Sequence, residues 1–213
     1  MKILALDSSG LVASAAVVED DVLIAEYTTD YKKTHSQTLL PMLDEIRQMI
    51  DLDLHTIDAI AISAGPGSFT GLRIGAATAK GLGLALNLPL VEVPTLEGLA
   101  YNFWGSDRLI CPIMDARRNQ VYTGLYRFDE AGNLVTEMDQ IPMDVNELID
   151  LLLEKDEEVQ FTGDGIQVYG SQILSKMKHA RLAPAHLNKQ KAGSVAYAGA
   201  YRYAHEQYIN GDD

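Results

Sequence analysis

The chain has 213 residues, 47% of them hydrophobic, which is enough to bury one large core or two smaller ones. Its net charge is -13 and its 17 Lys and Arg residues are scattered, which argues against direct, strong binding of RNA or DNA, because such binding needs cations placed against phosphates. The single Cys111 cannot form an internal disulfide. No run approaches the ~18 apolar residues of a membrane span, and the opening MKILALDSSG enters a strand pattern without a secretory signal. We therefore expect a cytoplasmic protein.

The first half of the chain alternates between strand and helix patterns. Apolar, β-branched runs separated by polar turns predict three strands at 2–9, 14–20 and 22–30. An amphipathic helix is predicted at 35–51, with a core stripe formed by Leu39, Leu43, Ile46 and Ile50. The pattern then predicts a strand at 58–65, a helix at 71–86, a strand at 88–93 and a helix at 95–104 capped by Thr95.

The second half repeats this order more loosely. Strands are predicted at 108–118, 120–132 and 134–143, a helix capped by Asp144 at 144–155, a strand at 159–165, a helix at 168–177, a short strand at 180–185 and a last helix at 192–209. A duplicated βββαβαβα order predicts two similar α/β lobes of the actin, Hsp70 and sugar-kinase type. We expect an N-terminal lobe at 1–104, a C-terminal lobe at 105–190, and packing of the terminal segment 191–213 on the first lobe.

Proteins of that fold group bind the phosphates of ATP and a metal ion with an Asp at the end of the first strand and a glycine-rich turn in the second lobe. Asp7, Ser8 and Ser9 stand at the position of that Asp, and Gly163, Asp164 and Gly165 resemble the glycine-rich turn. These six residues are the candidate nucleotide cleft, vestigial or active. The other interpretation is that Asp7 and its serines form a plain turn, because Asp and Ser readily bond to their own backbone.

The most distinctive stretch is AISAGPGSFTGLRIGAATAKGLGLAL, residues 61–86. It lacks the Lys of a Walker loop, the third glycine of a Rossmann fingerprint and the flanking glycines of a nucleophile elbow. Gly71, Gly75, Ala79 and Gly83 instead recur every fourth residue, and glycine inside a helix costs ~1 kcal/mol relative to Ala. We therefore expect close helix packing on this row, with one side of the helix on its own sheet and another against a partner. The other interpretation is that this helix and the one at 35–51 are covered within the monomer, by the second lobe or by the C-terminal helix.

The run SAGPGSFTGLRIGAATAKGLGLAL, with ILALDSSG and THSQTLLPML, resembles the TsaB (YeaZ) family of tRNA threonylcarbamoyladenosine biosynthesis proteins. The resemblance implies a non-catalytic subunit that binds the paralogue TsaD, the enzyme that modifies N6 of the adenosine next to the anticodon. It also implies a TsaE-like ATPase partner, contact with tRNA only through the complex, and a homodimer when the chain is alone. The resemblance implies that no cofactor is required. Binding of ATP or ADP in the cleft or in the assembled complex is an alternative that the sequence leaves open.

The resemblance also places the partner interface on the two N-terminal helices. The expected contacts are Leu39, Leu40, Met42, Leu43, Phe69, Leu72, Arg73, Gly75, Ala76 and Ala79. The catalytic paralogue binds metal through two histidines spaced i and i+4, whereas His35 is followed at that spacing by Leu39. We therefore expect neither a metal site nor a catalytic residue, and we expect His35 to be a cap or a surface residue.

Two further points follow from the sequence. Family members usually continue into a Tyr-Leu-Arg tail that returns to the first lobe, but this chain ends in YINGDD, so the contacts of that tail cannot be carried over. The alternative function is a small ATP-dependent enzyme of the kinase-like group that uses the cleft between the lobes. A peptidase is not supported, because no nucleophile and base are paired in the sequence.

Overall fold

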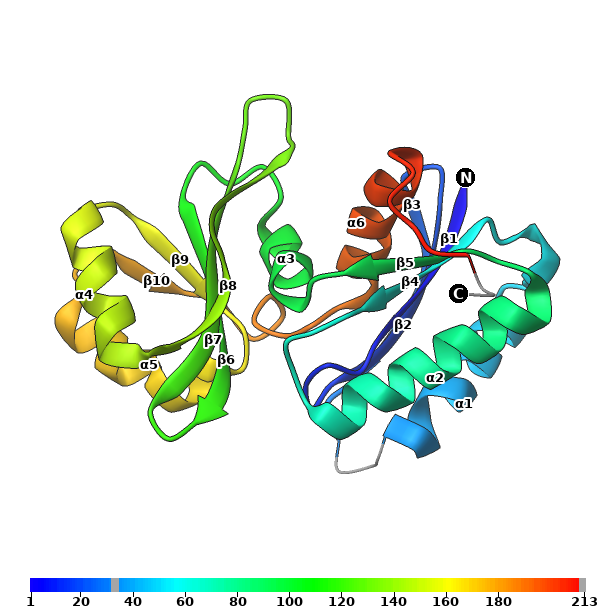
Figure 1. Cartoon of the computed structure of the whole chain (residues 1–213), viewed down its shortest axis with the longest axis horizontal. Coiled ribbons are helices and arrows are strands. Elements are labelled where there is room, and N and C mark those ends of the chain that lie inside the picture. Colours follow the sequence, from blue (N-terminus) through cyan, green and yellow to red (C-terminus); the bar gives the residue numbers. More distant parts are fainter. Residues whose placement is uncertain (32–34, 211–213) are drawn as a thin grey trace. The chain divides into compact units, whose positions relative to one another are not determined.

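The computed structural model describes residues 1–31 and 35–210, and the chain divides into two units (Figure 1). The first unit contains Met1–Gly98 and returns at Gln190, and the second contains Leu99–Lys189. Each unit is built around its own five-stranded mixed sheet.

The first sheet has the order β3-β2-β1-β4-β5. Strand β1 pairs antiparallel with β2 and parallel with β4, so its carboxyl end lies beside that of β4. The strands are β1 (Lys2–Asp7), β2 (Ala13–Glu19), β3 (Val22–Thr29), β4 (Ala59–Ser63) and β5 (Leu90–Val93). The central strands are buried on both faces, which explains their continuous apolar runs.

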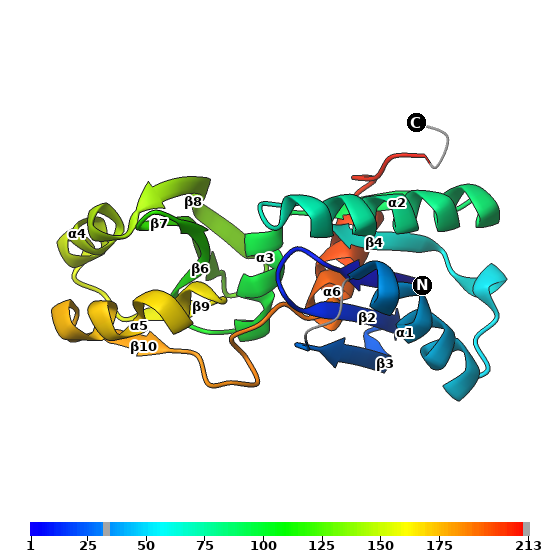
Figure 2. The same ribbon diagram turned by 90° about the horizontal axis from the view of Figure 1, so that it is seen from below.

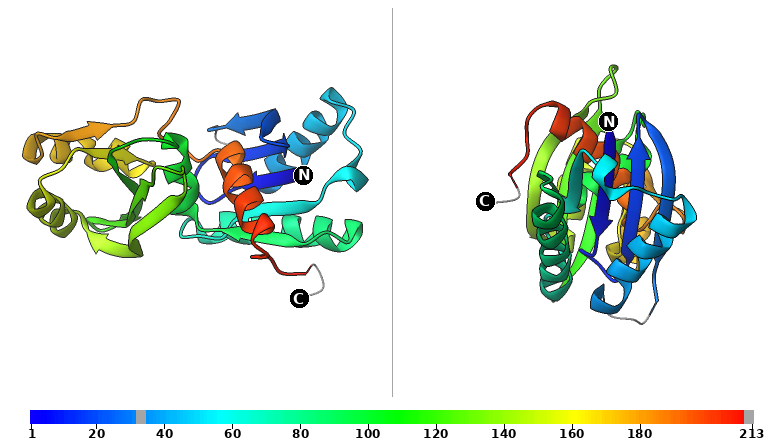
Figure 3. Two further views of the ribbon diagram at one scale, coloured as in Figure 1. Left: turned by 90° about the horizontal axis from the view of Figure 1, so that it is seen from above. Right: turned by 90° about the vertical axis from the view of Figure 1, so that its right-hand side faces the viewer.

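Helices cover both faces of this sheet. α1 (His35–Met49) and α2 (Phe69–Leu86) pack on one face, and α6 (Ala192–Ala204) packs on the other. Figure 2 views the unit with α1 and α2 in front, and the left panel of Figure 3 views it with α6 in front. The core between the sheet and α1 and α2 includes Leu4, Leu39, Met42, Ile60 and Ala79.

The second unit repeats this plan. Its sheet has the order β10-β9-β6-β7-β8, which is the order of the first sheet read in reverse. The strands are β6 (Leu109–Arg117), β7 (Gln120–Phe128), β8 (Leu134–Asp144), β9 (Val159–Thr162) and β10 (Ala180–Leu182). α4 (Val145–Lys155) and α5 (Gly165–Lys176) complete an apolar core with Leu109, Val121, Leu148, Phe161 and Ile173. The predicted duplicated two-lobe α/β fold is confirmed.

The helix ends differ in informative ways from the predictions. Asp144 caps α4 as expected, because its side chain accepts a hydrogen bond from Asn146 N. Thr95 does not serve as the predicted cap: it is the first residue of α3 (Thr95–Ala100), and its hydroxyl accepts from Gly65 N at 3.1 Å. Short 3₁₀ helices lie at η1 (Leu54–Thr56) and η2 (Tyr101–Phe103), and η2 occupies the end of the helix that was predicted over 95–104.

The last helix stops earlier than the sequence predicted. α6 ends at Ala204, and the segment after it reaches the edge of the first sheet, where Ile209 and Leu90 exchange two backbone hydrogen bonds of 2.9 Å. The end of the described chain therefore does return to the first unit through Ile209. Among the described residues, no helix has the length and apolar character needed to cross a bilayer.

Candidate docking face and the buried Asp7 turn

Asp7 closes β1 and is only 2% exposed. Its Oδ1 accepts hydrogen bonds from Ser9 N at 2.9 Å and Ser9 Oγ at 2.8 Å, and its Oδ2 accepts one from Ser63 Oγ at the end of β4. Burial raises the pKa of the Asp7 carboxyl, against the opposing effects of these hydrogen bonds and of nearby His35. Both carboxyl oxygens are therefore bound within the chain. Ser63 was not singled out in the sequence, although a polar residue that closes an apolar strand was a usable signal.

The glycine-rich stretch lies directly on the turn that follows Asp7. Ser68 N donates to Ser9 O at 2.6 Å, and Ser8 Oγ donates to Gly71 O at 2.8 Å. A Cβ atom at Gly67 would lie 2.2 Å from Ser9 O, and one at Gly71 would lie 2.1 Å from Ser8 O. These glycines allow two backbone segments to touch. The prediction that they serve packing rather than phosphate agrees with this geometry.

The row of small residues on α2 faces inward, which corrects part of the predicted interface. Gly75 and Ala79 are buried on the chain's own sheet, and a Cβ at Gly75 would lie 2.4 Å from Ser8 Oγ. On α1, Leu39, Met42 and Leu43 are buried in the same core. These five residues have no surface to offer a partner in this structure. Met42, which is not among the four residues of the predicted core stripe, also belongs to the core.

The remaining predicted interface residues lie at the surface. Phe69 is 69% exposed and Leu40 is 53% exposed, while Arg73 and Ala76 are exposed and Leu72 is half-buried. The Arg73 guanidinium sits 3.9 Å from the centre of the Phe69 ring, in a cation–π contact.

Leu84 is 66% exposed and, by helical spacing, continues the stripe of Phe69, Arg73 and Ala76 along α2. Lys80 lies on the same stripe between Ala76 and Leu84, so the stripe combines exposed apolar side chains with two cations. Exposed apolar side chains bordered by charged ones are typical of an interaction site. We call the surface formed by Leu40, Phe69, Leu72, Arg73, Ala76 and Leu84 the docking face.

His35 is the first residue of α1 and is half-buried rather than at the open surface. Its Nε2 donates to the Gly10 carbonyl at 2.8 Å, and Leu39, one turn later, points into the core. Across residues 1–31 and 35–210, no group of three or more His, Cys, Asp or Glu side chains is arranged to hold a metal ion. The prediction that His35 is a cap or a surface residue is therefore corrected: its side chain is half-buried and bonds to the backbone of the Gly10 turn.

The corresponding turn of the second unit is also filled by its own chain. Gly163 has a φ of 97°, and a Cβ there would lie 2.2 Å from Ile113 O, while one at Gly165 would lie 2.9 Å from the same atom. Asp164 Oδ1 accepts from Asp115 N at 3.2 Å, and burial raises the pKa of its carboxyl. Each half of the candidate nucleotide cleft is thus a tightly packed turn within its own unit.

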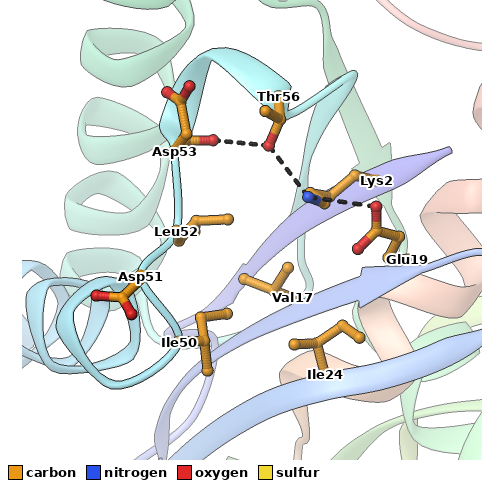
Figure 4. A pocket seen from close by; sticks show the side chains of 9 residues that line it. All are labelled: Lys2, Val17, Glu19, Ile24, Ile50, Asp51, Leu52, Asp53 and Thr56. Atoms are coloured by element: carbon orange, nitrogen blue, oxygen red, sulfur yellow. Dashed lines mark hydrogen bonds and ion pairs between the residues drawn. The ribbon is translucent and has the colours of Figure 1, made fainter.

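A small pocket lies elsewhere in the first unit, at the start of β1 (Figure 4). It has a volume of about 220 Å³ and an apolar wall that includes Val17, Ile24 and Leu52. Lys2 Nζ donates to Thr56 Oγ1 at 3.1 Å and pairs with Glu19 at 3.3 Å. Because Lys2 begins β1 and Asp7 ends it, this pocket is separate from the candidate nucleotide residues.

The titration of Asp7 gives a testable consequence. Because its pKa is higher in the folded chain than in the unfolded chain, the folded state retains a proton that the unfolded state loses, and stability falls as pH rises from about 4 towards neutral. Asp7→Asn removes this titration. We expect the Tm of the wild-type chain, relative to the variant, to be highest near pH 4 and to decline towards pH 7 in scanning calorimetry. A relative Tm that instead rises with pH would mean that the folded chain favours the carboxylate.

Comparisons with known proteins fit this geometry. The profile of the family described as "TsaD: tRNA N6-adenosine threonylcarbamoyltransferase" matches residues 23–208. The Bacillus subtilis (strain 168) protein named tRNA threonylcarbamoyladenosine biosynthesis protein TsaB is 38% identical over 177 residues, 81% of this chain and 75% of that protein. The Escherichia coli (strain K12) protein of the same name is 38% identical over 135 residues, 62% of this chain and 58% of that protein.

Solved structures share the fold. A Pseudomonas aeruginosa structure described as an uncharacterized protein with similarity to peptidase YEAZ has a TM-score of 0.83 at 23% identity, over 100% of this chain and 96% of that chain. The ROK hexokinase from Thermus thermophilus has a TM-score of 0.53 at 13% identity, over 96% of this chain and 100% of that chain. The two sheets, the GPGSFTGLR turn and the curated relatives agree: the chain belongs to the TsaB (YeaZ) family, which acts in tRNA threonylcarbamoyladenosine biosynthesis.

Proposed function

We propose that this chain is a non-catalytic subunit that binds a TsaD-like paralogue and is required for that paralogue to modify tRNA. The observation that carries the proposal is the docking face, where Phe69, Leu40 and Leu84 are each more than half exposed on two helices whose opposite faces pack into the core of the unit. Met49 in the last turn of α1 is also exposed and extends the apolar surface of that helix. Covering exposed apolar side chains of this kind with a partner removes them from water, which stabilises the complex.

The chemistry of the docking face limits the partner. Arg73 and Lys80 are the only charged residues of α2, and both are exposed. The rest of the chain is strongly acidic. A partner helix pair with an apolar stripe and a carboxylate opposite Arg73 would fit this face, and a paralogue with the same fold has matching helices to offer. A second copy of this chain offers the same apolar stripe, which is why we expect a homodimer when the paralogue is absent.

The non-catalytic part of the proposal rests on the filled turns. Asp7 is buried and has both oxygens engaged, and the glycines at 67 and 71 hold α2 against the turn where a phosphate would have to enter. We therefore expect no cofactor to be required by this chain, although ATP or ADP bound in the assembled complex is compatible with the proposal. In that complex a TsaE-like ATPase would supply nucleotide hydrolysis, and tRNA would be contacted through the assembly.

The alternative function is a small ATP-dependent enzyme, which is favoured by the fold shared with a hexokinase. It predicts ATP turnover by this chain alone, lost in Asp7→Ala. The two functions are separated by mixing the chain with its host's TsaD-like protein and measuring mass by light-scattering chromatography, with ATP hydrolysis assayed in parallel. We expect a one-to-one complex and no turnover by the isolated chain. Separate elution at micromolar concentrations would contradict the proposal.

A further inference from the structure

His35 connects three segments of the first unit that are distant in sequence. It begins α1, its Nε2 donates to the carbonyl of Gly10 in the β1–β2 turn, and its ring lies against the first turn of α2. A Cβ at Gly71 would lie 3.1 Å from His35 Cδ2, so the absence of a side chain at Gly71 is what admits the ring. One side chain thus touches both helices that carry the docking face and the turn beneath them.

The turn beneath His35 is itself fixed. Ser9 bonds to Asp7 through its N and Oγ, Ser8 Oγ donates to Gly71 O, and Ser9 O accepts from Ser68 N. α2 is therefore tied to the turn at its cap and in its first turn, independently of His35. On α1, the only described hydrogen bond between the first residue and this turn is the one from His35 to Gly10.

The other roles open to a histidine fit this geometry poorly. Nε2 is committed to a carbonyl, which can only accept, so in the neutral ring Nδ1 is the bare acceptor. Nδ1 is buried and has no hydrogen-bond partner among residues 1–31 and 35–210, and the nearby Asp7 has its oxygens engaged by Ser9 and Ser63. Neither nitrogen is presented to a substrate.

We infer that His35 is a positioning residue: it holds the start of α1, the helix that carries Leu40, on the Gly10 turn and against Gly71 in the first turn of α2, the helix that carries Phe69. The inference rests on the proposed function for its effect on binding. Its effect on the free chain does not depend on any partner.

The test uses a matched pair of variants. His35→Leu keeps an apolar side chain of moderate size but removes the donor, whereas the side-chain amide of His35→Gln can still donate to Gly10 O. His55→Leu is the control, because His55 is an exposed histidine of η1. In the free proteins, hydrogen exchange of the backbone amides in the N-terminal half of α1 should accelerate several-fold in His35→Leu and stay near wild type in the other two. Exchange in α2, which Ser8 and Ser9 hold independently of His35, should not change.

Binding kinetics with the TsaD-like paralogue separate positioning from direct contact. If His35 keeps α1 in its binding-competent place, His35→Leu reduces the competent fraction, and kon falls about tenfold while koff changes little. His35→Gln should restore kon to within about twofold of wild type. A rise in koff with unchanged kon would identify a contact residue and overturn the inference, because losses of interface contact act mainly on koff.

Two further outcomes are decisive. If His35→Leu does not fold, His35→Asn replaces it, since its amide is one methylene too short to reach Gly10 O, and a wild-type kon in that variant would contradict the inference. If the wild-type chain does not bind the paralogue at all, the proposed function fails, while unchanged amide exchange in the free His35→Leu and His35→Asn chains would still overturn the positioning role.

Discussion

Gly71→Ala is expected to lower the free energy of unfolding by about 2–3 kcal/mol, the upper part of the range for overpacked cores. The added methyl would lie 2.1 Å from Ser8 O and 3.1 Å from the His35 ring, and the first of these neighbours is backbone that cannot rotate away. For a chain of this size the corresponding fall in Tm is roughly 4–12 °C. Chemical denaturation followed by circular dichroism measures it.

Gly81→Ala is the matched control on the same helix. Nothing lies within 4 Å of a Cβ placed at Gly81, and the position is exposed, so the alanine should stabilise α2 by up to ~1 kcal/mol through helix propensity alone. Opposite signs for the two variants are therefore expected. If Gly71→Ala were as stable as the wild type, α2 would not approach the Asp7 turn as closely as described. The argument that this turn has no room for a phosphate would then fail.

Phe69→Asp is expected to weaken binding of the TsaD-like paralogue at least ~30-fold without lowering the Tm of the free chain. Phe69 is 69% exposed, so its removal leaves no cavity, but an aromatic side chain that anchors an interface contributes about 2 kcal/mol or more, and the new carboxylate would be buried by the partner. The Arg73 cation–π contact is lost in the same variant. Titration calorimetry measures the change in Kd.

Val168→Asp controls for the added charge. Val168 is 58% exposed on α5 of the second unit, which is outside the docking face, so this variant should bind the paralogue like the wild type. Equal weakening by both variants would indicate a general effect of negative charge. Unchanged binding by Phe69→Asp would mean that the paralogue does not bind at this face of α2.

The order of the elements was predictable because each strand and helix of the chain carries its own local pattern. The repeated strand order, with β1 and β6 central in their sheets, follows from the duplicated sequence of elements. The cap of α4 was equally local, since Asp144 needs only the backbone two residues later. The unusual row from Gly71 to Gly83 correctly indicated close packing on one side of α2.

The target of that packing was not predictable from the pattern. Helical periodicity separates the stripes of α2 but does not say which stripe faces the sheet, and the contact that decides it joins Ser8 to Gly71 across 63 positions of sequence. Gly75 and Ala79 were therefore placed on the wrong side. Thr95 was misjudged for the same reason, because its hydroxyl is taken by Gly65 N from another loop. The residues of the candidate nucleotide cleft lie at the end of β1 and in the turns that follow β1 and β9, and only the packing around Asp7 and Gly163 shows that these turns are filled.

The most direct test of the proposal is an assay of threonylcarbamoyl transfer to tRNA, with this chain alone, with its TsaD-like paralogue alone and with both, the TsaE-like ATPase being present throughout. The proposal predicts modified tRNA only when both proteins are present, with Asp7→Asn supporting wild-type yield and Phe69→Asp supporting little. Transfer by this chain without the paralogue, or full transfer by the paralogue without this chain, would contradict it.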